Sequence, residues 1–259
     1  MSVLAKSLDY ILCEGASDSR FISLYLCKKF GFSYNPDETR KFNPLTKNGF
    51  YIYLSSENRD LLIISCDGCS NIDNYFVDVV KPLFTNRGID SRIWIVIDRD
   101  KKNDGECLDL ISECRSHLNV LVNQWESGTI SGGFTKQDGS KTLVKYKVFF
   151  AVIPSDKPGA FETILLKAAL NSEPDIYNCV NSFFNHLPIE AKKYIDKPRK
   201  ELKAFLDVIL ILMDPETLFG NLESLFNLID FNDSEIQKNY MFLNDVLSAF
   251  WFFSLKLVF

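Results

Sequence analysis

The chain has 259 residues, of which 46% are hydrophobic and 24% charged, and its formal net charge is −5. This composition is typical of a globular protein with a full hydrophobic core, and the negative charge excludes adhesion to nucleic acid over the whole surface. No apolar stretch resembles a signal peptide or reaches the roughly 20 residues of a membrane span, so we expect a cytoplasmic protein without membrane contact.

The first 170 residues alternate between strand and helix patterns. In chain order, the predicted elements are a strand over Leu8–Cys13, a helix over Ser17–Phe30, a hairpin of Phe50–Leu54 and Leu61–Ser65, a helix over Ser70–Phe84, a strand over Ile93–Ile97, a helix over Glu106–His117, strands over Val120–Gln124 and Val144–Ile153, and a helix from Pro158 to Leu170. Residues 31–49 predict a loop, and residues 128–141 predict a mobile loop or hairpin tip. This order is typical of an α/β fold with a central, mostly parallel sheet flanked by helices.

Beyond Ser172 the sequence pattern is helical only. Proline, glycine and Asn breaks separate five predicted helices, over residues 175–186, 189–195, 199–212, 216–228 and 234–254. We therefore expect a domain over residues 1–170 and a helical region over residues 171–259 packed on it. The tail from Val246 to Phe259 is strongly apolar but too short to cross a bilayer, and it predicts a packed terminal helix or a subunit contact.

Acidic side chains stand at the ends of two predicted strands. Glu14 follows the first strand directly, and Asp98 and Asp100 follow the run that begins at Ile93. Parallel strands deliver their carboxyl ends to one edge of a sheet, where α/β proteins bind ligands, so we expect these three acids to converge. Converging carboxylates repel one another unless a cation lies between them, and Mg²⁺ favours carboxylates with water and phosphate oxygens. The sequence therefore predicts a Mg²⁺ or Mn²⁺ site.

Three further acids lie near predicted strand ends. Glu162 and Asp18 each fall in the first turn of a predicted helix, so they are candidates for a second metal ion or for orienting water. Each could instead stabilise the N-terminus of its own helix. Asp67 precedes Gly68, and the ordinary interpretation of this residue is that it forms a turn.

These motifs resemble a known pattern. A strand ending in Glu14-Gly15 with Asp18 three residues after the glycine, followed by a strand ending Asp98-Arg99-Asp100, is similar to the Toprim module of topoisomerases, primases and several nucleases. Within that superfamily the chain most resembles the overcoming-lysogenization-defect nucleases and small Toprim-like proteins linked to phage defence. The segments that support this likeness are Asp67–Asn71, Pro158–Glu162 and Lys197–Lys203. The chain departs from the pattern in two places, because the glycine after Asp-x-Asp arrives only at Gly105, and Cys69 stands where nuclease relatives often carry a basic residue.

The resemblance implies a Toprim-like Rossmannoid fold and a metal-dependent endonuclease that hydrolyses phosphodiester bonds in DNA or RNA. Such a reaction needs the phosphoryl charge neutralised, a water activated and the leaving oxygen stabilised, which one or two Mg²⁺ or Mn²⁺ ions supply. We expect Glu14, Asp98 and Asp100 to hold the first ion, although Glu14 could instead act as a general acid or base. Asp18 and Glu162 are the candidates for the second.

The reaction also requires a cation near the scissile phosphate. Lys203 is the first choice, with Lys200 and Lys157 as reserves. The stretch from Lys192 to Lys203 holds six cations against two anions, so it predicts either a nucleic-acid contact or a solvated helix face. We also expect an ATPase or sensor protein as a possible partner, and self-association through the apolar tail.

Other functions fit part of the sequence. A haloacid-dehalogenase-type phosphatase would use Asp98 as its nucleophile, but no pair of adjacent acids follows Asp100. A non-catalytic Toprim-like regulatory or assembly subunit would bind nucleic acid or a partner without cleaving it. The seven cysteines are an odd number and favour reduced thiols, and Cys66 and Cys69 lack the second half of a zinc site.

Overall fold

The structure is a computed structural model that describes residues 7–42, 50–57, 59–83, 91–119, 124–126, 129–134, 144–213, 230–234, 236–241 and 243. By the density of contacts the chain divides into two units, Met1–Ile153 and Pro154–Phe259. The helix α6 (Phe161–Ser172) therefore belongs with the later helices, whereas the sequence analysis grouped it with the sheet. Each unit is described by itself.

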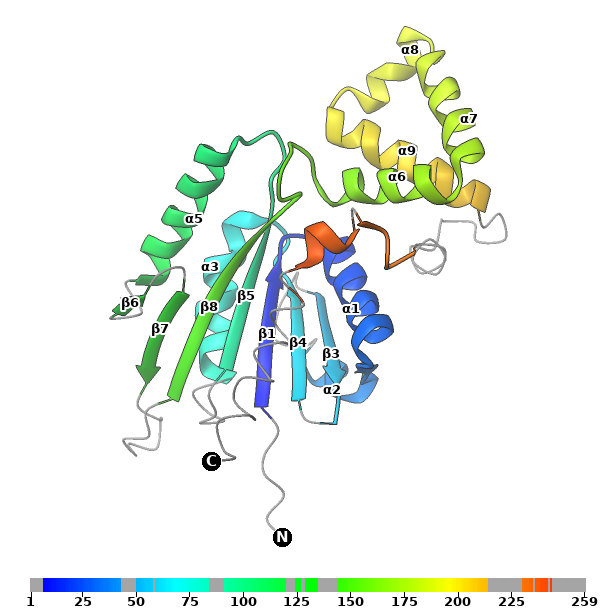
Figure 1. Ribbon diagram of the computed structural model, residues 1–259. Coiled ribbons are helices and arrows are strands. Elements are labelled where there is room, and N and C mark those ends of the chain that lie inside the picture. Colours follow the sequence, from blue (N-terminus) through cyan, green and yellow to red (C-terminus); the bar gives the residue numbers. More distant parts are fainter. Residues whose placement is uncertain are drawn as a thin grey trace. The chain divides into compact units, whose positions relative to one another are not determined.

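The first unit is an α/β structure built on an eight-stranded sheet (Figure 1). Its elements are β1 (Ser7–Cys13), α1 (Ala16–Phe30), β2 (Ser33–Tyr34), α2 (Pro36–Phe42), β3 (Phe50–Ser55), β4 (Arg59–Ser65), η2 (Cys69–Asn71), α3 (Ile72–Tyr75), η3 (Phe76–Val80), β5 (Ser91–Asp98), α5 (Asp104–Asn119), β6 (Gln124–Glu126), β7 (Thr129–Phe134) and β8 (Val144–Ile153). The strand order is β2-β3-β4-β1-β5-β8-β7-β6. The four central strands β4, β1, β5 and β8 are parallel, while the strands outside them pair antiparallel on both sides.

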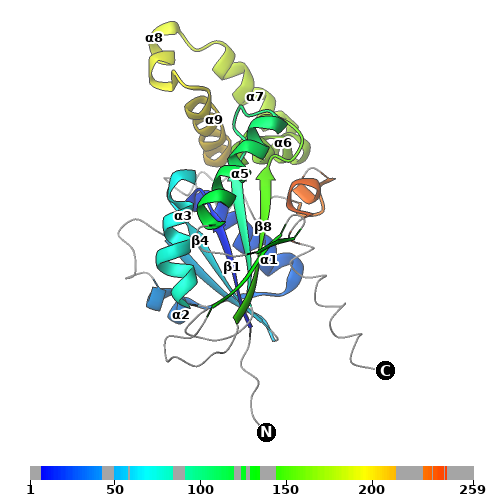
Figure 2. The ribbon, with the colours of Figure 1, turned by 90° about the vertical axis from the view of Figure 1, so that its left-hand side faces the viewer.

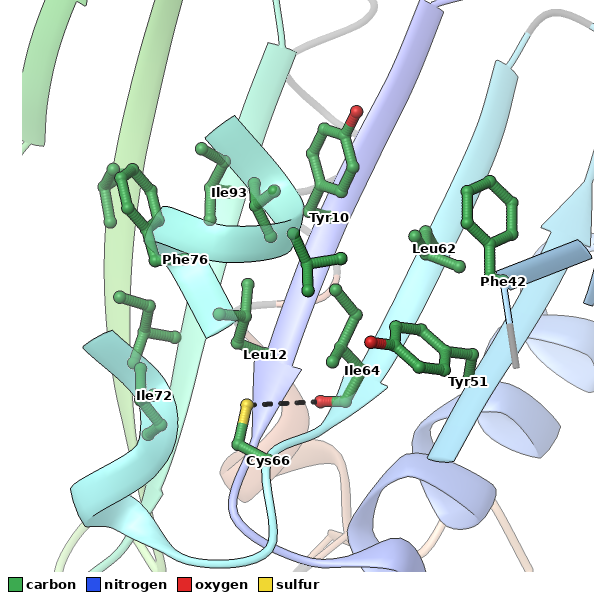
Figure 3. Close-up of a cluster of buried hydrophobic side chains, with 14 of the residues drawn as sticks. Tyr10, Leu12, Phe42, Tyr51, Leu62, Ile64, Cys66, Ile72, Phe76 and Ile93 are labelled. Atoms are coloured by element: carbon green, nitrogen blue, oxygen red, sulfur yellow. Dashed lines mark hydrogen bonds between the residues drawn. The ribbon is translucent and has the colours of Figure 1, made fainter. Parts of the chain in front are cut away.

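Helices cover both faces of this sheet, with α1 on the face opposite α3 (Figure 2). Buried residues of α1 pack against β1, β3 and β4. On the other face, alternate residues of the parallel strands form a core with α3 and η3, in which Tyr10, Leu12 and Ile93 lie beside Ile72 and Phe76 (Figure 3). The strands are buried on both faces, which explains why their sequences are continuous apolar runs.

A buried carboxylate fixes β1 between its two neighbours at the end of the sheet where β1 begins. Asp9 is 1% exposed and accepts hydrogen bonds from the backbone N–H of Arg92 at 2.9 Å and from its guanidinium at 2.9 Å. Arg59 on β4 forms a further ion pair with the same carboxylate. Burial is the main reason that the pKa of Asp9 rises to about 6, although the charge of Arg92 opposes this rise. The network therefore holds β1 in register with β4 and β5.

The predicted strands and helices of this unit agree with the structure, apart from two segments predicted as loops and the strand predicted over Val120–Gln124. Of that strand only Gln124 is described, as the first residue of β6. Residues 31–49 were expected to form a loop, but the structure has β2 and α2 within them. The side chain of Asn35 accepts a hydrogen bond from the backbone N–H of Glu38 at 3.0 Å, and Pro36 begins the helix, so a side-chain cap and a proline start α2. The second exception is the predicted loop over residues 128–141, because β7 lies within it and pairs with β6 and β8. Residues 120–123 and 135–143 lie outside the described part.

In the second unit every described element is a helix. These elements are α6, α7 (Pro174–Asn185), α8 (Ile189–Lys192), the short helix η4 (Lys193–Ile195) and α9 (Pro198–Met213). Helices α6, α7 and α9 contact one another, with Phe205 of α9 packed against Tyr177 and Phe184 of α7. These helices agree with the predicted spans 175–186, 189–195 and 199–212. The predicted helix over 216–228 lies outside the described residues, the span 234–254 is described only up to residue 243 and is helical there, and the apolar tail from Val246 lies outside them too.

Among the described residues, no helix combines the length and the apolar character that a membrane crossing requires.

Candidate functional site

The carboxyl ends of β1, β4 and β5 lie together at one edge of the sheet. Cys13, the last residue of β1, is in register with Ser65 on one side and Val96 on the other. The backbone continues this pairing beyond the strands, because the N–H of Gly68 donates a hydrogen bond to the carbonyl of Glu14 at 2.9 Å. The loops that follow these strands are therefore joined at the edge where the sequence predicted a site.

Glu14 and the end of β5 are in direct contact. Oε1 of Glu14 accepts a hydrogen bond from the backbone N–H of Asp98 at 2.9 Å, although the two residues are 84 positions apart. Asp98 itself is 4% exposed. The Glu14 carboxylate thus contacts the backbone of the second acidic motif. Convergence of the three carboxylates stays a prediction.

A lysine that the sequence analysis did not single out lies beside Asp100. The ammonium of Lys102 is 3.4 Å from Oδ2 of Asp100 and 3.5 Å from the backbone carbonyl of Asp98. Asp100 has a left-handed backbone, with φ of +53°. Lys102 supplies a positive charge next to two of the predicted metal ligands, and it lies in the same unit as they do.

Several negative charges lie near the buried thiol of Cys13. Burial raises the pKa of this thiol well above its ordinary value, and the nearby charges of Asp18, Asp98 and Glu14 raise it further. Three carboxylates therefore act on the end of β1. A cation bound among them would be electrostatically favoured.

Asp18 has a structural role in this edge. Its Oδ2 accepts a hydrogen bond from the backbone N–H of Gly15, the N-cap residue of α1, at 3.0 Å. A methyl group on Gly15 would come within 2.7 Å of the same oxygen, so a larger residue here would displace the Asp18 carboxylate from this hydrogen bond. The helix-stabilising alternative for Asp18 is therefore realised.

Two aspartates at this edge adopt a backbone conformation that is unusual for residues other than glycine. Asp67, with φ of +55°, and Asp100 are the only such residues in the described ranges, and Gly68 beside Asp67 has φ of +110°. Asp tolerates this region better than most residues, but the conformation still has an energetic cost. Asp67 forms the turn, as the sequence predicted.

A hydrogen-bonded pair of thiols lies close to these acids. The Cys114 thiol on α5 donates to Cys69, which lowers the pKa of Cys69 and raises that of Cys114. Lys102 also lowers the pKa of Cys69, while Glu14 raises it. The pKa of Cys69 therefore depends on both the acidic and the basic side chains at this edge of the sheet.

The donor set at this edge consists of hard carboxylate oxygens. In the part of the chain that the structure describes, no group of three or more His, Cys, Asp or Glu side chains is arranged to hold a metal ion. Mg²⁺ is commonly bound by one or two carboxylates, with water and substrate phosphates completing its octahedron. Glu14, Asp98 and Asp100 are donors of this chemical type, but in the described residues they are not gathered as a group of three around one position.

Glu162 and Lys203 belong to the second unit, where they form an ion pair. Nζ of Lys203 lies 3.6 Å from Oε1 of Glu162, whose side chain is 7% exposed. The other oxygen, Oε2, is buried and has no hydrogen-bond partner among the described residues. Burial raises the pKa of Asp207, and the charge of Glu162 adds to that rise while Lys203 opposes it. Asp207 was missed in the sequence, where its position in a helix carries no distinguishing signal.

The two reserve lysines are placed differently. Lys200 pairs with Asp196 at 3.0 Å one helical turn away, on an exposed surface. Lys157 is half-buried in the loop before α6. Each of these lysines also belongs to the second unit.

The chain belongs to the family described as "Protein of unknown function (DUF3226)", whose model matches residues 9–248. No curated protein matches the chain. Among solved structures, it is similar to a hypothetical protein, PH0156, from Pyrococcus horikoshii OT3. The two share 17% sequence identity over 89% of this chain and 96% of that protein, with a TM-score of 0.48.

Proposed function

We propose that this family member is a divalent-metal-dependent nuclease that hydrolyses phosphodiester bonds in DNA or RNA, with a Toprim-like site at the sheet edge. The observation that carries the proposal is the hydrogen bond from the Asp98 N–H to Oε1 of Glu14. It brings the acid that follows β1 to the backbone of Asp98, the acid that ends β5. Carboxylates gathered in this way repel one another and favour a bound cation.

Glu14, Asp98 and Asp100 would hold Mg²⁺ or Mn²⁺. When bound, the ion neutralises phosphoryl oxygens, lowers the pKa of a coordinated water and stabilises the leaving oxygen. The hydrogen bond from the Asp98 amide fixes the Glu14 carboxylate and still leaves lone pairs on it, because a carboxylate has about four acceptor sites. The backbone of β1 and β5 thus orients the donors before any substrate arrives.

Lys102 supplies the cation that the reaction requires close to these acids. Its ammonium is 3.4 Å from Asp100 and half-buried, so it can donate to a phosphate oxygen that approaches the same edge. The sequence predicted this role for Lys203, which belongs to the second unit and pairs with Glu162 there. There, the buried Oε2 of Glu162 is an unpaired acceptor that supports a second metal or water-binding role.

A second candidate function is a non-catalytic Toprim-like subunit that regulates or assembles with other proteins. The Lys102–Asp100 ion pair favours it, because an ammonium already neutralises part of the acidic charge. In that case the edge would be a structural polar cluster that needs no metal.

The cellular context is a separate part of the proposal. We propose a cytoplasmic effector of phage defence, restrained by an ATPase or sensor partner, on the basis of the family resemblance in the sequence. Expression of the wild type and of Glu14→Gln, with and without phage, tests this part. Equal growth and equal phage titre for the two proteins would remove it.

The nuclease activity is tested by incubating the full chain with plasmid DNA and with total RNA, in Mg²⁺, in Mn²⁺ and in EDTA. Glu14→Gln and Asp98→Asn keep the side-chain shape, and we expect each to abolish cleavage. Asp109→Asn, an exposed acid on α5, is the matched control and should cleave like the wild type. Cleavage that persists in EDTA, or in both site variants, would contradict the proposal.

Metal binding gives an independent readout. At a metal concentration about 100 times the Kd, a ligand that binds only the folded state stabilises it by about 2.7 kcal/mol. We expect this gain in the wild type and its loss in Asp98→Asn. A well-folded wild type with metal-independent stability favours the non-catalytic subunit.

A further inference from the structure

The connection between α7 and α9 carries exposed lysines and an exposed aromatic ring. It consists of α8 and η4 and lies at the end of this helical unit opposite α6 (Figures 1 and 2). We call five of the exposed side chains in this connection the basic tip, namely Ile189, Lys192, Lys193, Tyr194 and Lys197. All five are exposed to solvent, in a chain whose formal net charge is −5.

In the part of the chain that the structure describes, the lysines of the basic tip are not held in ion pairs, although Lys193 lies over the ring of Tyr194. Among the described residues, Lys192, Lys193 and Lys197 form no ion pair with a carboxylate. Farther along the same stretch, Lys200 pairs with Asp196 and Lys203 with Glu162, so those two positive charges are partly neutralised within the unit. The basic tip therefore carries three lysines within six residues of sequence, Lys192 to Lys197. Two exposed acids, Glu190 and Asp196, lie in the same connection, and Asp196 is already paired with Lys200.

The aromatic ring of the basic tip is presented to solvent. Tyr194 is 72% exposed, and the ammonium of Lys193 lies 4.9 Å from the centre of its ring. Ile189, which is 85% exposed, adds apolar surface beside the same cations. A flat ring with a cation over it, flanked by further lysines, matches a nucleotide, in which a base offers a face for stacking and a phosphate offers negative charge.

We propose that the basic tip binds single-stranded nucleic acid, with Lys192, Lys193 and Lys197 on the phosphodiester backbone and Tyr194 stacked on an unpaired base. A solvated helix face alone would explain the lysines, but it would not explain an exposed tyrosine under one of them. The inference deepens the proposed function and rests on it for the role of nucleic acid as substrate. It names the surface that engages the polymer.

Binding is measured without cleavage, by fluorescence anisotropy of a labelled single-stranded DNA and a labelled single-stranded RNA in EDTA, at several salt concentrations. The double variant Lys192→Gln, Lys193→Gln removes two phosphate contacts. The negative slope of log K against log salt should therefore become shallower by about 1.4. Tyr194→Ala should weaken binding about fivefold or more with little change in that slope. The matched control is Arg40→Gln with Lys41→Gln, an exposed pair on α2 that removes the same charge.

Loss of binding in the basic-tip variants, with the control variant binding like the wild type, supports the inference. Equal loss in the control would overturn it, as would a wild type that binds neither polymer. Vesicles containing an anionic phospholipid form a further arm, and binding to these vesicles without binding to oligonucleotide would also overturn it. A protein that binds through the basic tip but never cleaves in Mg²⁺ or Mn²⁺ would leave this inference standing and refute the nuclease.

Discussion

Replacing Lys102 by methionine should strengthen metal binding at the sheet edge. The ammonium lies 3.4 Å from Oδ2 of Asp100. Since Mg–O bonds are about 2.1 Å long, an ion on that oxygen lies at most about 5.5 Å from the ammonium. A single and a double charge at that separation repel by about 1.5 kcal/mol even at the dielectric constant of water, which is roughly a tenfold change in Kd.

The assay is titration calorimetry with Mn²⁺ on the full chain, supported by the metal-dependent shift in Tm. We expect Lys102→Met to bind Mn²⁺ roughly ten times more tightly than the wild type, while cleavage falls because a phosphate-binding cation is lost. Lys101→Met removes the same charge from an exposed neighbour and should leave the Kd almost unchanged. Unchanged or weaker Mn²⁺ binding in Lys102→Met would refute the placement of the ion on Asp100.

Three further predictions concern stability and reactivity. Gly15→Ala places a methyl group 2.7 Å from the carboxylate of Asp18 at the start of α1. We expect the free energy of unfolding, measured in urea, to fall by about 1 kcal/mol. An unchanged urea midpoint would contradict the close contact. The pKa of Asp9 is raised from 3.8 to about 6, so the folded state binds this proton more tightly than the unfolded state. The free energy of unfolding should therefore fall by up to about 3 kcal/mol as the pH rises from 3.8 to about 6. Asp9→Asn should flatten this pH dependence, and an equal slope in both proteins would contradict it. The hydrogen bond from Cys114 lowers the pKa of Cys69, whereas burial raises the pKa of Cys66. Iodoacetamide at neutral pH should therefore modify Cys69 before Cys66, as followed by mass spectrometry over time. The reverse order would be evidence against the thiol pair.

Hydrophobic pattern was sufficient to predict the parallel strands and the acids at their ends. Glu14 and Asp98 each stand at the end of a continuous apolar run. Such a run is typical of a parallel strand that is buried on both faces, so the position of each acid at a strand end could be predicted. Helix α2 was missed because its polar composition outweighed a local signal, the Asn35-Pro36 start followed by acids. Strand β7 was missed because its glycines resemble those of a loop.

Side-chain partnerships were harder to predict than elements. Lys101 and Lys102 are adjacent and chemically identical in the sequence, and only the left-handed backbone at Asp100 and the turn after it direct Lys102 back toward the acids. The pairing of Lys203 with Glu162 likewise depends on how α9 packs on α6, which no spacing in the chain encodes.

The described sheet ends in very short strands on both sides, two residues in β2 and three in β6. Edges of this length offer few unpaired backbone groups to the strand of another molecule, so they oppose growth of the sheet into intermolecular ribbons. At the β2 edge, which is described on both sides, this opposes edge-to-edge pairing in a protein whose sequence is 46% hydrophobic. Any assembly of copies would then have to use side-chain surfaces rather than extension of the sheet.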